Sequence, residues 1–125
     1  MASITSNVTL TSSGLSSSAI NISKAPTLTV NGDFKIEKVA LSTTSKLILT
    51  AADYGASYVW LYNTDTSIAI SIGEDAAEHT DAMDQVHMLL AAGEWAFFPW
   101  DSTVNLYADA ASGTPKLEIA IFEKA

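Results

Sequence analysis

Apolar and polar residues alternate with a period of two along much of this chain, most clearly from Tyr58 to Ile72 (YVWLYNTDTSIAISI). Two β-rich runs flank the polar segment from Asn63 to Thr66, and Asn and Asp are residues that tight turns favour. The alternation predicts a β-hairpin with one buried face. Its alternating apolar positions are Val59, Leu61, Ile68, Ile70 and Ile72.

Further strands are predicted from Val86 to Pro99 and from Val104 to Phe122, after a polar insert at residues 73–85. In the last of these strands Leu117, Ile119 and Ile121 alternate with other residues, and a helical period is sustained nowhere. Roughly eight to ten short strands, spaced about 8 to 12 residues apart, indicate an all-β fold. We therefore predict a single-domain β-sandwich or jelly roll of antiparallel strands.

The first 30 residues differ in composition, because Ser, Thr and Asn alternate there with isolated apolar residues. A segment this polar has little apolar surface with which to offset its ordering entropy. We predict an extended arm or edge strands over residues 1–30, a turn at Asn31–Asp33, and a sandwich domain over residues 31–125. An ordinary N-terminal strand is the alternative. The arm's predicted contact residues are Ile4, Val8, Leu10, Ile20 and Ile22.

The charge balance narrows the possible partners. Fourteen acidic residues face six lysines and no arginine, which gives a formal net charge of -8. Proteins that bind nucleic acid or anionic membranes use Lys and Arg to neutralise phosphates, so we expect neither as a partner. Only 16% of the residues are charged, which suits a subunit packed against others but also any small all-β domain. The chain lacks cysteine, a signal-like N-terminus and a long apolar run, so we expect a protein made in a cytoplasm.

The insert at residues 73–85 holds the densest group of carboxylates, the oxygen ligands that calcium prefers. Its spacing does not match the EF-hand loop. We predict no metal and no cofactor, with calcium bound by this loop as the alternative. The candidate ligands are Glu74, Asp75, Glu78, Asp81 and Asp84.

His79 and His87 are the two imidazoles that could act as a general base or bind zinc. Their spacing is not that of a helical zinc motif, and the chain has no Gly-x-Ser-x-Gly elbow for a nucleophile. We predict no catalytic residues, and a small hydrolase using one of these histidines is a rival interpretation.

Aromatic residues concentrate at Trp60 and in the strand from Trp95 to Trp100. Strand alternation places Trp95 on one face, and Phe98 with Trp100 towards the other. Aromatic side chains beyond those that the core accepts are typical of an interface, although simple core packing is the alternative. We predict interface roles for Trp60, Trp95, Phe98 and Trp100. A glycan-binding module of a tail or spike, with exposed tryptophans beside a polar groove, is a further alternative.

Several of these runs together resemble small virion proteins of tailed bacteriophages. The resemblance rests on Leu61–Asp65 (LYNTD), Leu90–Pro99 (LAAGEWAFFP), Leu106–Ala108 (LYA) and Leu117–Glu123 (LEIAIFE), which lie within residues 58–123. It implies a structural β-sandwich subunit of the particle, a decoration or cement protein on the capsid surface that is assembled in the bacterial cytoplasm. The implied partners are the major capsid protein and further copies of the chain, arranged as a homotrimer.

Overall fold

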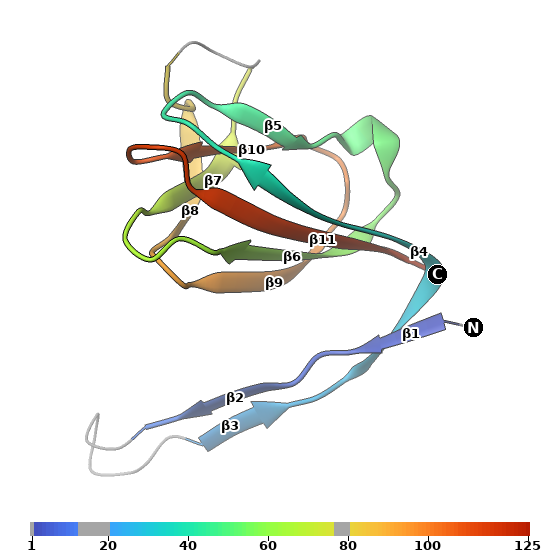
Figure 1. Ribbon diagram of the computed structural model, residues 1–125. Coiled ribbons are helices and arrows are strands. Elements are labelled where there is room, and N and C mark those ends of the chain that lie inside the picture. Colours follow the sequence, from blue (N-terminus) through green and yellow to red (C-terminus); the bar gives the residue numbers. More distant parts are fainter. Residues whose placement is uncertain (1, 13–20, 77–80) are drawn as a thin grey trace. The chain divides into compact units, whose positions relative to one another are not determined.

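In a computed structural model, the chain is described at residues 2–12, 21–76 and 81–125. These residues form two compact units, the first made of those up to Gly32 together with Ala125, and the second of those from Asp33 to Lys124. The described part of the chain holds eleven strands and one short 3-10 helix (Figure 1). Their bounds are β1 Ala2–Thr5, β2 Val8–Thr11, β3 Asn21–Lys24, β4 Thr27–Ala40, β5 Lys46–Leu49, η1 Ala51–Asp53, β6 Ser57–Asn63, β7 Ile70–Glu74, β8 Gln85–Leu90, β9 Trp95–Trp100, β10 Leu106–Ala110 and β11 Lys116–Lys124.

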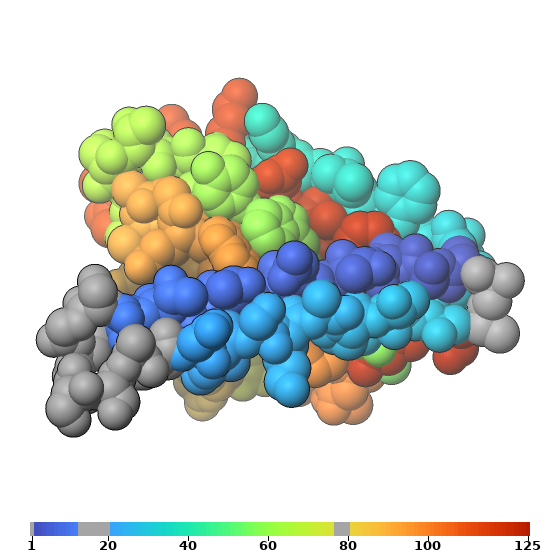
Figure 2. All heavy atoms as spheres, turned by 90° about the horizontal axis from the view of Figure 1, so that it is seen from below, coloured from blue at the N-terminus to red at the C-terminus, as the bar shows by residue number. Residues whose placement is uncertain are grey.

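The first unit is a two-stranded antiparallel ribbon, because β1 pairs with the start of β4 and β2 pairs with β3. Ala2 lies opposite Val30 and Thr11 opposite Asn21, and the register is the same at both ends. Figure 2 shows the two antiparallel segments of the ribbon as adjacent dark blue and light blue rows of atoms. The regular pairing stops near Pro26, which has no N–H to donate to a ladder.

The second unit is a β-sandwich of two antiparallel sheets (Figure 1). One sheet has the order β4-β11-β6-β9, with β4 contributing its residues from 33 onwards, and the other has the order β5-β10-β7-β8. Between consecutive strands the chain crosses from one sheet to the other, except between β7 and β8, which pair directly. In the described part of the chain the sandwich thus has eight strands, four in each sheet.

The core lies between the two sheets and consists of their inward-facing aliphatic side chains. Leu61 of β6 and Ile119 of β11 come from one sheet, while Ile70 of β7 and Ala108 of β10 come from the other. All four side chains are almost completely buried. The all-β sandwich predicted from the alternation is therefore confirmed.

The predicted hairpin between Tyr58 and Ile72 is wrong. β6 pairs with β11 and β9, whereas β7 pairs with β10 and β8, so the two strands belong to different sheets. Their apolar alternation was read correctly, since Val59 and Ile70 are both buried in the same core. A hairpin and a crossover between facing sheets bury the same alternating positions, and the sequence pattern does not distinguish them.

The predicted turn at Asn31–Asp33 is also wrong, because β4 runs through it from Thr27 to Ala40. Gly32 has a φ of 105°, which only glycine adopts readily, and the two units divide at this residue. The strand count exceeds the predicted eight to ten because the ribbon contributes three short strands, β1 to β3, beyond the eight of the sandwich.

Candidate functional site

The outer face of the β4-β11-β6-β9 sheet is covered with aromatic side chains. Core-facing positions of β6 are fully buried, and the alternate positions Tyr58, Trp60 and Tyr62 are partly exposed. Their direct neighbours on β9 and β11 share this face, since Trp60 lies opposite both Phe97 and Ala120. We call this surface the aromatic face. Its aromatic members are Phe34, Tyr58, Trp60, Tyr62, Trp95, Phe97 and Phe122.

The contacts between these rings fall into three groups across the four strands. Phe34 stacks on Phe122 with 6.2 Å between ring centroids, and Tyr58 stacks on Phe97 at 6.1 Å. Trp60 stacks on Trp95 at 5.2 Å with an interplanar angle of 26°. Offset stacking of this kind holds the rings in fixed orientations and stabilises the fold beyond the contribution of buried apolar area. The face therefore presents a rigid apolar surface.

Charged side chains occupy only the margins of the aromatic face. Along the outward side of β11 the order is Glu118, Ala120, Phe122 and Lys124, so an acid and a base lie at opposite ends of one strand. The Lys124 ammonium lies 4.9 Å from the centroid of the Tyr58 ring, a cation–π contact. The outward positions of β6 and β9 hold no ionisable acid or lysine.

Two of the four predicted aromatic interface residues lie on the other side of the sheet. Trp100 is 5% exposed and belongs to the core, and Phe98 packs against that core. The alternation assigned them correctly to the face opposite Trp95, but that face is the inner one. Trp60 and Trp95 do lie on the outer face, where Trp95 is 47% exposed. The same alternation along residues 58–62 would have found Tyr58 and Tyr62.

The ribbon has one apolar side and one side of hydroxyl and amide groups. Leu10 lies opposite Ile22, and these side chains are 55% and 51% exposed. On the alternate positions Thr9 lies opposite Ser23, and their hydroxyl oxygens are 3.3 Å apart. Of the other predicted arm residues, Ile4 and Val8 occupy positions of the same parity as Leu10, and Ile20 lies outside the described residues.

The predicted calcium ligands are only partly within the described residues, because Glu78 lies outside them. The Asp75 carboxylate accepts a hydrogen bond from the Ser45 hydroxyl, and Glu74 lies on β7 beside β8. Asp81 and Asp84 precede β8 in the chain. Among residues 2–12, 21–76 and 81–125, no three His, Asp or Glu side chains converge as a metal site.

His79, one of the two histidines of the rival hydrolase interpretation, also lies outside the described residues. His87 projects from β8, and its Nε2 lies 2.8 Å from the Glu74 Oε2 on the neighbouring strand β7. The His87 side chain is exposed and the Glu74 side chain partly exposed. This cross-strand pair has the geometry of a surface contact between adjacent strands.

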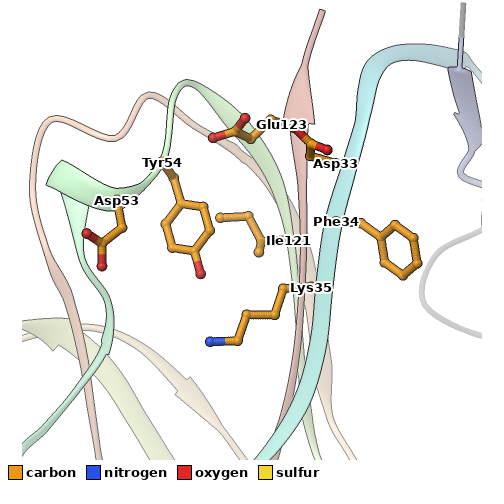
Figure 3. Close-up of a pocket in the computed structure, with 7 residues that line it drawn as sticks. All are labelled: Asp33, Phe34, Lys35, Asp53, Tyr54, Ile121 and Glu123. Atoms are coloured by element: carbon orange, nitrogen blue, oxygen red, sulfur yellow. The ribbon is translucent and has the colours of Figure 1, made fainter.

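A shallow cleft of about 300 Å³ opens between β4, η1 and the end of β11 (Figure 3). The Tyr54 hydroxyl points towards the Lys35 ammonium, and Ile121 lies beside the Tyr54 ring (Figure 3). The pKa of Lys35 is raised above its ordinary value because the Tyr54 oxygen and the Glu37 carboxylate, 3.4 Å away, favour the charged form. At the other end of the cleft the Glu123 carboxylate accepts a hydrogen bond from the Gly55 N–H. The polar groups at each end of the cleft are therefore paired with neighbours within the chain.

Comparisons with protein-family models, curated proteins and solved structures found no match for the chain. In the described part of the chain no helix has the length and apolar character to cross a membrane. The candidate binding surfaces are the aromatic face of the sandwich and the apolar side of the ribbon, because both expose large apolar side chains.

Proposed function

We propose that the protein is a structural virion protein, a decoration protein that stabilises a phage head by bridging neighbouring capsid subunits. It acts by packing against other subunits and carries out no reaction. In this proposal it is assembled in the bacterial cytoplasm, resides on the capsid surface, and contacts the major capsid protein and further copies of itself.

The observation that carries the proposal is the ribbon with its exposed apolar side. Within the described residues of the first unit the pairings are β1 with β4 and β2 with β3, and an isolated two-stranded ribbon is marginally stable in water. Leu10 and Ile22 nevertheless lie opposite each other and are each about half exposed. Such a ribbon gains its stability by laying its apolar side on another protein or by adding its strands to a sheet edge.

The charge of the chain supports the same role. A subunit of net charge -8 with no arginine is repelled by packaged nucleic acid and remains soluble before assembly. The resemblance of residues 58–123 to small tailed-phage virion proteins supplies the specific context of the capsid surface.

The proposal is tested with capsids from a phage whose copy of this gene has been deleted. Full-length chain is mixed with these capsids, and the bound fraction is measured by co-sedimentation. Replacing Leu10 and Ile22 together with serine should reduce binding at least about tenfold, since both lie on the apolar side. The matched control replaces Thr9 and Ser23 with alanine on the opposite side of the same ribbon and should bind as wild type does.

Equal binding by the two pairs of variants would contradict the assigned role of the ribbon. Failure of the wild-type chain to bind these capsids would contradict the proposed function itself. Circular dichroism of each variant checks that the sandwich remains folded.

A second candidate function is recognition of a host glycan, favoured by the stacked and partly exposed Trp60 and Trp95. Sugar rings pack on exposed aromatic faces, and Trp95 also borders a shallow groove formed with Leu89 and Glu94. Titration with host surface polysaccharide should then change tryptophan fluorescence, and Trp95→Ala should abolish the change. An unchanged emission spectrum at saturating polysaccharide would rule this candidate out.

A further inference from the structure

The aromatic face leaves rigid rings at the surface of an otherwise well-packed sandwich. Trp, Tyr and Phe are enriched in protein interfaces, where they bury large areas at a low cost in side-chain entropy. Phe34 is 65% exposed although it is already stacked on Phe122. Ile36, the next outward position of β4, is also more than half exposed. This face has the composition of an interface core.

The occupant of the face is indicated by its charges. A chain of net charge -8 repels its own copies over most of its surface. The centre of the aromatic face, formed by outward positions of β6 and β9, has no charge to oppose association. On its margins, β4 carries Lys38 at the outward position after Ile36. β11 carries Glu118 at one end and Lys124 at the other, about 20 Å apart at the rise of an extended strand.

This arrangement is self-complementary under a two-fold rotation. Consider a two-fold axis that lies between two such faces and runs across the strands at the level of Ala120 and Phe122. It stacks β11 antiparallel on the partner's β11, so Glu118 of each copy faces Lys124 of the other. In an isologous interface each contact occurs twice, which gives two such pairs. Two sheets stacked about 10 Å apart would enclose the rings of both copies.

We propose that the aromatic face binds the same face of a second copy, forming a two-fold dimer with reciprocal Glu118–Lys124 pairs. Trp60, Tyr58 and Phe122 form its centre. This inference rests on the proposed role as an assembling subunit and names the partner of one surface. It replaces, for this surface, the three-fold arrangement that the resemblance implies, because two flat faces that oppose each other require a two-fold axis.

The experiment is sedimentation velocity of the full-length chain across a concentration series, with reversed charges at the ends of β11. Wild type should sediment as a dimer that dissociates on dilution. Lys124→Glu places acids opposite each other at both ends of the interface, and Glu118→Lys places bases there. Juxtaposed like charges at an interface are strongly unfavourable, so each single variant should raise the dimer Kd by about tenfold or more.

The double variant Glu118→Lys/Lys124→Glu restores opposite charges across the two-fold axis. Its dimer Kd should return to within about threefold of wild type, a recovery that only reciprocal contact between these positions explains. The matched control is Lys46→Glu, the same change of charge at an exposed position of β5 in the other sheet. It should leave the dimer intact.

A wild-type chain that stays monomeric, a trimer, or a double variant no tighter than the single variants would each overturn the two-fold pairing. A monomer that still binds capsids would overturn this inference and leave the proposed function standing. A dimer that rescues as expected but does not bind capsids would support the pairing and contradict the decoration role. Thermal melts of the variants establish that each remains folded, so that dissociation is not read from an unfolded chain.

Discussion

Trp60 and Trp95 stack on adjacent strands with 5.2 Å between their ring centroids, on the side of the sheet that faces away from the core. Trp95 is paired directly with Tyr62, and Trp60 with Phe97, so the two indoles are diagonal neighbours. Diagonal cross-strand contacts are within reach of large aromatic side chains. The stack therefore orders the exposed side of the sheet without contributing to the core.

The two sides of β9 should respond differently to truncation. Trp95→Ala removes a half-exposed ring and one stack, and should lower the free energy of unfolding by about 1 kcal/mol. Trp100→Ala removes a buried ring from the core and should cost about 4 kcal/mol. Urea unfolding at a concentration where the chain is monomeric measures both values. Equal losses would contradict the assignment of the two faces.

Gly73 is required by a close approach between β7 and β8. A Cβ atom at this position would lie 1.8 Å from the backbone oxygen of Gln85, where the pairing shifts register. Gly73→Ala should therefore force the strands apart and reduce stability by about 3 kcal/mol. The control is Gly55→Ala, whose Cβ would first meet the Glu123 carboxylate at 4.0 Å and should have little effect. Thermal unfolding of both variants tests the difference, and similar melting temperatures would count against it.

Asn63 joins three segments at the end of β6. Its buried Nδ2 lies within 2.8 to 3.1 Å of the carbonyl oxygens of Ile68, Leu90 and Ala91, and its Oδ1 accepts from the Asp65 N–H. Asn63→Ala leaves these buried groups without partners and should cost about 3 kcal/mol. Asn105→Ala loses one bond from the Ala51 N–H and should cost less. Denaturant unfolding measures the loss in free energy of unfolding for both variants. A larger loss for Asn105→Ala than for Asn63→Ala would refute the assigned role of Asn63.

Asp65 gives the fold a dependence on acid pH. Its carboxylate accepts hydrogen bonds from the N–H groups of Ser67 and Ile68, both at 2.8 Å, and these bonds lower its pKa below the ordinary 3.8. A lowered folded-state pKa contributes stability above the unfolded value of 3.8, which is lost as pH falls through the folded pKa. Asp65→Asn retains an acceptor oxygen and does not titrate.

The stability of wild type should therefore fall more steeply than that of Asp65→Asn as pH decreases from 5 to 2. Asp101, whose pKa is lowered by hydrogen bonds from the Thr103 hydroxyl and N–H, contributes in the same direction. The double variant with Asp101→Asn should flatten the profile further. Urea unfolding at intervals of half a pH unit measures these slopes, and parallel curves for wild type and variants would exclude the contribution.

The sequence was sufficient to predict the all-β sandwich, because the period of two is a local property of each strand. Partners of the strands are not local, which is why β6 and β7 were predicted to pair although they lie in facing sheets. The chain does turn between these strands as predicted, since the Asp65 carboxylate accepts hydrogen bonds from the N–H groups of Ser67 and Ile68. A turn of this type permits either a hairpin or a crossover.

The candidate surfaces could likewise be predicted only in part from the sequence. Alternation separated Trp95 from Phe98 and Trp100, but which of the two faces is covered depends on the second sheet. Phe34 joins the aromatic face from β4, far from β6 in sequence, and no local pattern connects it with Phe122. Gly32 was read as a turn because Asn-Gly-Asp favours one, whereas here its positive φ lies within a long strand.

The central claim is that this chain works as a subunit on the surface of a virus particle. Immunogold electron microscopy of virions from cells that express the gene tests it most directly, with antibody raised against the full-length chain and virions lacking the gene as the control. The account predicts gold label distributed over the capsid of wild-type particles and absent from the control. Unlabelled capsids, with the chain recovered only in the soluble fraction or at the tail, would contradict it.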